Sequence, residues 1–189
     1  MSKFSLHEPL LQGNEILNVK QCLKTGWLSS SGNFVNKFEK KLEDFTRTNV
    51  VCCNSGTSAL HVSLILAGVN SGDEVIVPTI TFIATVNSVL YCNANPVFMD
   101  CDESLCIDVD KILNFLKHNT YSLNNITFEK KTKKKISAIM FTNVFGNLID
   151  LKNLHKECKK RNIKLIEDAA ESLGSFYLKN NKHSGLNSD

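Results

Sequence analysis

The chain has 189 residues, of which 42% are hydrophobic, and this is enough apolar material to fill the core of one large domain. Its 22 Lys and Arg residues exceed its 19 Asp and Glu residues by only three, which excludes the basic excess typical of proteins that bind a nucleic-acid backbone. No apolar run approaches the roughly 20 residues of a membrane span, and residues 1–9 contain no apolar signal segment. We therefore expect a cytoplasmic protein with no nucleic-acid or membrane partner.

The cysteines show no spacing typical of a zinc site, because the sequence contains no Cys-x-x-Cys pair and no matching histidine pair. We therefore expect no metal site. Adjacent Cys52 and Cys53 would face opposite sides of a strand, and a free thiol packs well as a small apolar group. The pattern predicts reduced thiols buried in the core.

The first part of the chain is predicted to be helical. Residues 15–24 form a short helix that ends at Gly26, and residues 1–30 as a whole are expected to form an arm. Apolar residues then recur at helical spacing over 34–45, with charged residues on the other face, which predicts an amphipathic helix. We place the start of the main domain at residue 31, so that it covers 31–189.

From residue 50 onward, short apolar runs alternate with helical stretches. This alternation predicts an α/β fold in three layers, with a mainly parallel sheet between two layers of helices. The strands are expected at 50–53, 74–77, 97–99, 136–141 and 164–167, and the helices at 57–67, 82–91, 109–116 and 151–161.

One segment, residues 119–135, does not follow this alternation. It is polar and ends in five lysines within the six residues 130–135. Such a charged run is typical of a solvated surface loop, which is the structure we predict for it.

Ligands of parallel sheets bind beyond the carboxyl ends of the strands, so the residues that follow each apolar run are the informative ones. Small residues at 54–60 connect the first predicted strand to a helix, where exposed N–H groups and the Thr57 hydroxyl would bind a phosphate. A plain turn with a Ser or Thr N-cap is the alternative.

Two further strand ends are unusual. Phe82 follows the strand at 74–77 and is either a core side chain or a flat surface for a planar cofactor. Asp168 ends the strand at 164–167 and either caps the next turn or pairs with a cationic group, because a buried, unpaired charge costs several kcal/mol. A phosphate site, an aromatic surface and a strand-end acid together match the phosphate, ring face and ring nitrogen of pyridoxal phosphate.

In these motifs the chain resembles the DegT/DnrJ/EryC1/StrS family of sugar aminotransferases, which are pyridoxal-phosphate enzymes of fold type I. The resemblance implies the large domain of that fold, and it covers only the N-terminal half of the family pattern, ending before the small C-terminal domain. The matching segments are GWLSS at 26–30, NSGTSALH at 54–61, GDEVIVP at 72–78, TF at 81–82, FG at 145–146 and EDAAESLG at 167–174.

Carried over to this sequence, the resemblance implies five cofactor-binding residues. Gly56 and Thr57 would hold the cofactor phosphate, Phe82 would stack on the ring, and Asp168 would pair with the ring nitrogen. Glu171 would lie near the phenolic oxygen of the cofactor.

The resemblance implies substrate contacts and an assembly as well. It places Trp27, Ser29 and Ser30 close to the sugar, and it implies a homodimer. Asn143 departs from the family pattern, because relatives often carry histidine at this position.

The lysine that holds pyridoxal phosphate as a Schiff base is not identified within residues 1–189. Only Lys179 and Lys182 follow Asp168, and neither is assigned this role. Whether this chain by itself is an enzyme therefore stays open, as does its status as a natural product or a fragment.

For the complete protein, the resemblance implies transfer of an amino group, with glutamate as donor, to a nucleotide-linked keto-deoxy sugar for surface polysaccharides. Two alternatives remain: a sugar dehydratase of the same family, in which histidine replaces the lysine, and a truncated remnant without catalytic activity. A nicotinamide-binding Rossmann fold would share the alternating pattern but requires a Gly-x-Gly-x-x-Gly turn, which the sequence lacks.

Overall fold

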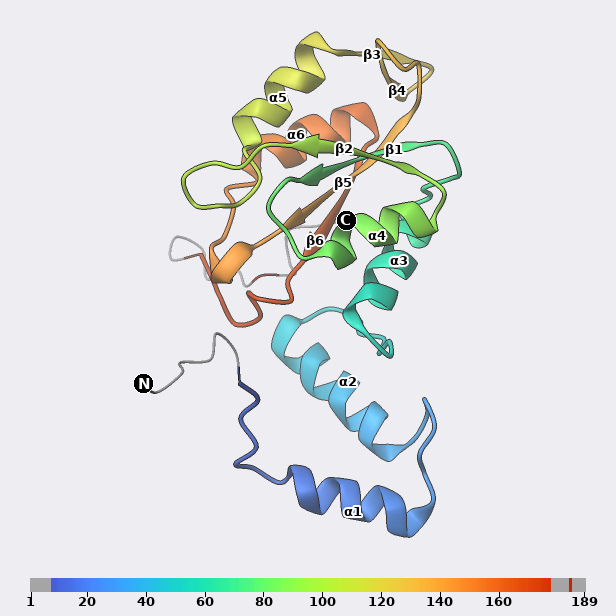
Figure 1. Cartoon of the computed structure of the whole chain (residues 1–189), viewed down its shortest axis with the longest axis vertical. Coiled ribbons are helices and arrows are strands. Elements are labelled where there is room, and N and C mark those ends of the chain that lie inside the picture. Colours follow the sequence, from blue (N-terminus) through green and yellow to red (C-terminus); the bar gives the residue numbers. More distant parts are fainter. Residues whose placement is uncertain (1–7, 178–183, 185–189) are drawn as a thin grey trace, which may run out of the picture.

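The computed structural model of the chain describes residues 8–177 and residue 184 (Figure 1). Helices and strands alternate through most of this range, as the apolar pattern predicts. In chain order the elements are α1 (Glu15–Thr25), α2 (Asn33–Thr46), α3 (Gly56–Leu66), β1 (Glu74–Pro78), α4 (Ile83–Tyr91), β2 (Asn95–Met99), α5 (Val109–His118), β3 (Thr120–Leu123), β4 (Ile126–Glu129), β5 (Ile136–Thr142), the 3-10 turn η1 (Val144–Gly146), α6 (Lys152–Arg161) and β6 (Lys164–Asp168).

Four strands form one parallel sheet in the order β2-β1-β5-β6. The register pairs Ile76 with Val97 and Ile139, and Thr142 with Asp168. Figure 1 shows α5 and α6 on one side of this sheet and α3 and α4 on the other. The predicted three-layer α/β/α architecture is therefore confirmed.

The core lies on both faces of the sheet, because alternate residues of a strand point to opposite sides. Ile76 and Ile139 belong to the cluster that includes α5 and α6, whereas Val75, Val77 and Met140 belong to the cluster that includes α3 and α4. Strands buried on both faces read as continuous apolar runs, which explains why the sequence pattern locates them correctly.

The surface loop predicted at 119–135 is wrong in part, because β3 and β4 form an antiparallel hairpin there. Asn124 and Asn125 connect the two strands with φ angles of 50° and 61°, the left-handed conformation that a two-residue hairpin turn requires. Thr127 fixes the hairpin to α6 through a 3.0 Å hydrogen bond to the carbonyl oxygen of Arg161. The apolar pattern does not predict these two strands because the hairpin buries only one face and their composition is therefore polar.

The strand predicted at 50–53 is also wrong, because the structure shows an irregular segment there. Its backbone is held by a side chain of α2, with the N–H of Cys52 donating to the Glu39 carboxylate over 2.8 Å. Val51 is 83% exposed, and Cys53 is exposed rather than buried, so the prediction of core thiols fails at this position. An apolar run becomes a strand only where a neighbouring strand supplies hydrogen bonds, and no described strand pairs with this segment.

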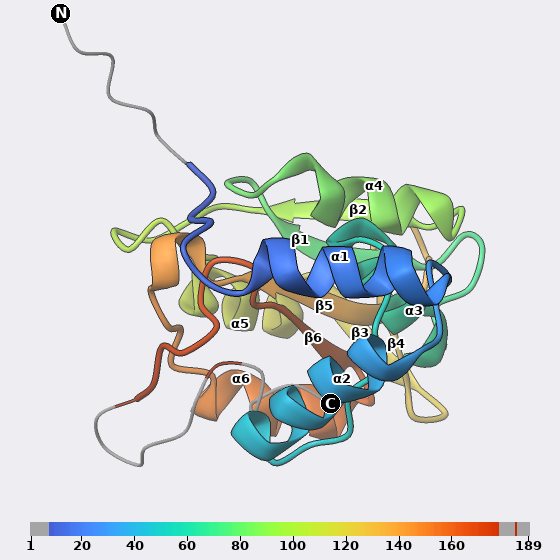
Figure 2. The same ribbon diagram turned by 90° about the horizontal axis from the view of Figure 1, so that it is seen from below.

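Helices α1 and α2 lie outside the three layers. Neither contains a buried residue, and Figure 1 places both apart from the sheet, while Figure 2 looks onto them from their own end of the molecule. Both helices were predicted at these positions, and α1 ends at Gly26 as expected. Because α2, like α1, contains no buried residue, the division at residue 30 stays a prediction. Within the described residues, no helix is long and apolar enough to cross a membrane.

Glu74 is a buried acid at the start of β1. Its side chain is only 3% exposed, and its Oε2 atom has no hydrogen-bond partner among the described residues. Burial raises the pKa of this carboxyl above its ordinary value, while a hydrogen bond with Thr132 opposes the rise and the charge of Glu129 adds to it. The folded protein therefore holds the Glu74 proton to a higher pH than the unfolded chain does.

This acid should make stability depend on pH. Between its ordinary pKa and its raised folded pKa, the folded state binds more protons than the unfolded state, so the free energy of unfolding should fall as the pH rises through that window. Glu74→Gln should remove this fall and raise the free energy of unfolding at pH 7 by about 1 kcal/mol. Urea denaturation between pH 4 and pH 8 measures it, with the exposed Glu103→Gln as the control. An unchanged pH dependence in Glu74→Gln would show that the buried acid is not responsible.

Candidate functional site

The carboxyl ends of three adjacent strands are joined by side-chain hydrogen bonds. Thr81, just after β1, lies 2.9 Å from the hydroxyl of Thr142 at the end of β5. Thr142 in turn is the register neighbour of Asp168, the last residue of β6. Residues from distant parts of the sequence thus meet at the edge where parallel sheets bind ligands.

Asp168 is the buried acid of this edge, with 8% of its surface exposed. Its Oδ2 accepts a 3.0 Å hydrogen bond from the Thr85 hydroxyl, and its Oδ1 accepts a 3.2 Å bond from the N–H of Ala170. Asp168 therefore caps the following turn, which is one of the two roles predicted for it from the sequence. No lysine, arginine or histidine within the described residues makes an ion pair with it. A buried carboxylate held in this way can still bind a cationic group.

Phe82 lies at the same edge and is exposed. It is the N-cap residue of α4, and 76% of its surface is accessible, so the alternative of a core phenylalanine is wrong. The carbonyl oxygen of Phe82 accepts from the N–H of Thr85 over 3.1 Å, and the side chain of Thr85 binds Asp168. One helical turn thus connects the aromatic ring to the acid.

The N-terminus of α3 also belongs to this edge. Residues 67–73 connect the end of α3 to the start of β1, and the helix is about 16 Å long, so it must begin toward the carboxyl ends of the strands. Ser55 caps the helix by accepting from the N–H of Ser58, which confirms the N-cap interpretation. A Cβ atom at Gly56 would meet nothing within 4 Å, and the N–H groups of Gly56 and Thr57 belong to the first turn. Such N–H groups have no partner inside the helix and can bind an anion.

Glu171 lies one turn beyond Asp168 and fixes the loop that follows β5. Its Oε2 accepts a 2.6 Å hydrogen bond from the N–H of Phe145, whose φ angle of 53° places it in the left-handed region. Glu171 itself is exposed. The structure therefore brings Glu171 to the same edge and gives its carboxylate a structural partner.

Asn143 is a site residue that sequence reasoning treated only as a departure from a family pattern. It is 1% exposed, and its amide donates to Glu167 over 2.6 Å and to Ser172 over 3.3 Å. Its Oδ1 atom is buried without a hydrogen-bond partner among the described residues. The backbone N–H of Asn143 also donates to the carbonyl oxygen of Asp168, so this unsatisfied acceptor lies beside the acid.

Three predicted residues do not join the others. Trp27, Ser29 and Ser30 are exposed on the connection between α1 and α2, which Figure 1 shows apart from the sheet. Their assignment to the sugar site stays a prediction. Lys179 and Lys182 lie outside the described residues.

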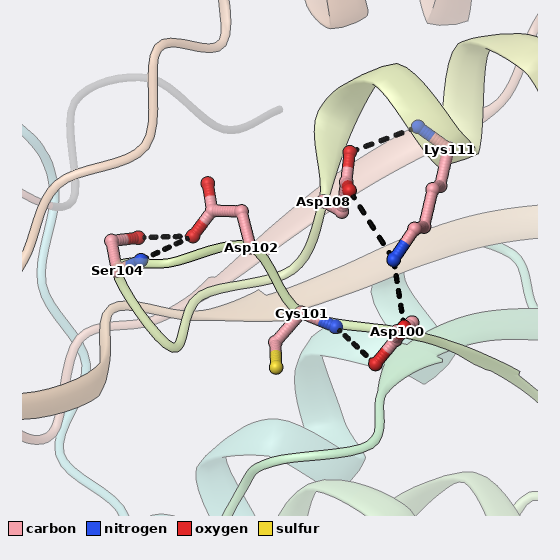
Figure 3. Close-up of polar contacts among 6 residues, drawn as sticks. All are labelled: Asp100, Cys101, Asp102, Ser104, Asp108 and Lys111. Atoms are coloured by element: carbon pink, nitrogen blue, oxygen red, sulfur yellow. Dashed lines mark hydrogen bonds and ion pairs between the residues drawn. The ribbon is translucent and has the colours of Figure 1, made fainter.

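An acidic cluster follows β2, but its charges are already paired (Figure 3). Lys111 lies 2.7 Å from Asp100 and 3.5 Å from Asp108, and Asp108 also caps α5. Asp102 accepts from both the N–H and the hydroxyl of Ser104. The hydrogen bond from Lys111 lowers the pKa of Asp100 below its ordinary value, and the same bond raises the pKa of Lys111. This cluster stabilises the start of α5 rather than leaving an acid available to a ligand.

The groups at the edge fit pyridoxal phosphate. Asp168 is a buried acid without a cationic partner in the described residues, and α3 begins with space above Gly56. Phe82 offers an exposed ring one helical turn before Thr85, the residue that binds Asp168. Asn143 adds an unsatisfied buried acceptor. A ring nitrogen, a planar ring and a phosphate are the complementary groups for the first three features.

Comparisons with known proteins agree with this fit. GDP-perosamine synthase of Caulobacter vibrioides is 36% identical over 178 residues, a match that covers 94% of this chain and 44% of that protein. Among solved structures, NtdA of Bacillus subtilis with bound PMP has a TM-score of 0.71 at 30% identity, over 88% of this chain and 35% of that one. Helicobacter pylori PseC, an aminotransferase involved in pseudoaminic acid biosynthesis, has a TM-score of 0.78 at 26% identity, over 97% of this chain and 45% of that one.

The chain thus spans less than half the length of these relatives. Its four-stranded parallel sheet corresponds to part of the fold-type-I aminotransferase structures. The model of one family, the DegT/DnrJ/EryC1/StrS aminotransferases, matches residues 9–188. The chain belongs to the DegT/DnrJ/EryC1/StrS aminotransferase family.

Proposed function

We propose that this chain supplies the cofactor-holding groups of a pyridoxal-phosphate-dependent sugar aminotransferase. The complete protein would transfer an amino group, with glutamate as donor, to a nucleotide-linked keto-deoxy sugar used in surface polysaccharides. The observation that carries the proposal is Asp168, a buried acid without a cationic partner in the described chain, at the same sheet edge as an exposed aromatic ring. The similarity to GDP-perosamine synthase supports the sugar-nucleotide class of substrate.

Each group at the edge would have a separate task. Asp168 would face the ring nitrogen and keep it protonated, because an opposite charge within about 4–6 Å favours the charged form. Phe82 would cover one face of the ring, and the first-turn N–H groups at Gly56 and Thr57, with the Thr57 hydroxyl, would bind the phosphate. When bound, pyridoxal phosphate supplies the electron-withdrawing ring that amino-group transfer requires.

The remaining predicted residues complete the proposal. Glu171 would approach the phenolic oxygen of the cofactor from the loop that it shares with Phe145. Trp27, Ser29 and Ser30 would contact the sugar, and the complete protein would act as a homodimer.

The second candidate is that this chain is a truncated remnant without catalytic activity, and one observation favours it. Ser63 and Leu66 of α3 and Ala67, which follows it, line a groove along the outer strand β6, and Leu66 is 82% exposed. Exposed apolar surface of this kind is typical of a face that packs against further protein. The dehydratase alternative remains as well, because the residue that decides it is not among those described.

Cofactor binding tests the central claim. The full chain should bind pyridoxamine phosphate, which needs no lysine for attachment, and Asp168→Asn should weaken that binding about 10-fold or more, because an ionic hydrogen bond is lost. Isothermal titration calorimetry measures the dissociation constants. Asp100→Asn is the matched control, since this acid also follows a strand of the sheet, β2, but is paired with Lys111. Equal affinity in the parent and Asp168→Asn would contradict the assignment.

Phe82 should affect the ligand and not the fold. Phe82→Ala should weaken pyridoxamine phosphate binding about 3- to 10-fold through the lost ring contact, while Phe82→Tyr should bind like the parent. The melting temperature should stay within about 2 °C, because the ring is 76% exposed and contributes little to the core. A large fall in melting temperature with unchanged affinity would identify Phe82 as a structural residue.

Product analysis distinguishes the three activities. With glutamate and a nucleotide-linked keto-deoxy sugar, the complete protein should form 2-oxoglutarate and an amino sugar in equal amounts. Mass spectrometry of the sugar detects the replacement of oxygen by an amino group. A deoxygenated sugar without an amine would indicate the dehydratase, and cofactor binding without any product would indicate the chain that lacks turnover.

A further inference from the structure

Three threonine hydroxyls form a chain that ends on Asp168. Thr142, at the end of β5, lies 2.9 Å from Thr81, Thr81 lies 2.7 Å from Thr85 of α4, and Thr85 lies 3.0 Å from the Oδ2 atom of Asp168. Thr85 is completely buried and Thr142 is 5% exposed. The four residues come from three segments of the sequence, around residues 81–85, 142 and 168, so only the folded sheet brings them together.

The hydrogen bonds of the three threonine hydroxyls have one donor-to-acceptor direction when Asp168 is a carboxylate. A carboxylate can only accept, so Thr85 must donate its single hydroxyl proton to it. The bond between Thr81 and Thr85 then needs the proton of Thr81, and the bond between Thr142 and Thr81 needs the proton of Thr142. All three hydroxyl dipoles therefore point toward the acid, and aligned hydrogen bonds strengthen one another.

We propose that Thr85, supported by Thr81 and Thr142, is a positioning residue that holds the Asp168 carboxylate aimed at the ring nitrogen of the cofactor. This inference rests on the function proposed above. The Thr85 hydroxyl fixes one carboxylate oxygen and the N–H of Ala170 fixes the other, so the plane of the carboxylate is set before any ligand binds.

Ser88 offers a matched control on the same helix. Like Thr85, it is completely buried, but its hydroxyl donates to the carbonyl oxygen of Thr85 over 2.8 Å and not to the acid. Removing the Ser88 hydroxyl therefore tests the cost of losing a buried hydrogen bond in α4 while the three-threonine chain stays intact.

The first experiment reads the ring nitrogen directly. Pyridoxamine phosphate labelled with 15N in the ring is bound to the full chain, and its 15N chemical shift reports the protonation of that nitrogen at pH 8. The parent, Thr85→Ser and Ser88→Ala should all show the protonated ring. Thr85→Val should move the shift toward the neutral ring and weaken binding about 10-fold. A parent-like shift and affinity in Thr85→Val would overturn the inference and leave the proposed function intact, whereas a parent that does not bind would overturn both.

The second experiment needs no cofactor. In the parent, NMR should show slow solvent exchange for the hydroxyl proton of Thr81, because it is committed to Thr85. Thr85→Val removes that acceptor and should speed the exchange about 10-fold, and Ser88→Ala should not. Unchanged exchange of the Thr81 hydroxyl proton in Thr85→Val would contradict the direction assigned to these hydrogen bonds.

Should Thr85→Val fail to fold, Thr81→Val is the second variant. It removes the next hydrogen-bond donor and should weaken pyridoxamine phosphate binding about 3-fold, and unchanged affinity would overturn the inference.

Discussion

The site depends on a carboxylate placed at the buried end of a strand. An acid in this position costs several kcal/mol unless hydrogen-bond donors or a cation compensate for lost water. In this chain the Thr85 hydroxyl and the N–H of Ala170 compensate Asp168 in part, and no cation of the described residues joins them. The sheet register, which sets Thr142 beside Asp168, is what holds the rest of the hydroxyl chain in reach.

The same sheet explains why the polar residues gather at one edge. Its inner strands β1 and β5 are buried on both faces, with Val75 on one side and Ile76 on the other, so the middle of β1 carries only apolar side chains. Polar groups are tolerated only where the strands end and loops begin. The carboxyl ends therefore collect Thr81, Thr142 and Asp168, while the opposite end carries the buried Glu74.

Features that depend on the local sequence could be predicted, and features that depend on contacts between distant segments could not. The inner strands β1 and β5 were predictable because burial on both faces leaves continuous apolar runs. Asp168 and Phe82 were predictable because they follow apolar runs. The run at 50–53 has the same pattern but pairs with no described strand, and strand pairing is a long-range property that the run itself does not encode. Residues 120–129 fold as a hairpin although their composition is polar, and only the Asn124–Asn125 pair signals the turn. The roles of Thr85 and Asn143 depend on register between distant segments, which periodicity does not reveal.

The hydrogen bonds that the edge residues already make within the protein also decide which further contacts a ligand can form. Glu171 and both oxygens of Asp168 already accept hydrogen bonds from the protein, so their positions are fixed before binding. Capacity remains at the exposed ring of Phe82 and at the first turn of α3. A ligand that meets these groups need not reorganise the protein, and affinity lost to ordering is correspondingly small. At this edge the carboxylates of Asp168 and Glu171 are fixed, while the Phe82 ring and the first turn of α3 remain available. This arrangement is suited to holding a planar, charged cofactor in one orientation.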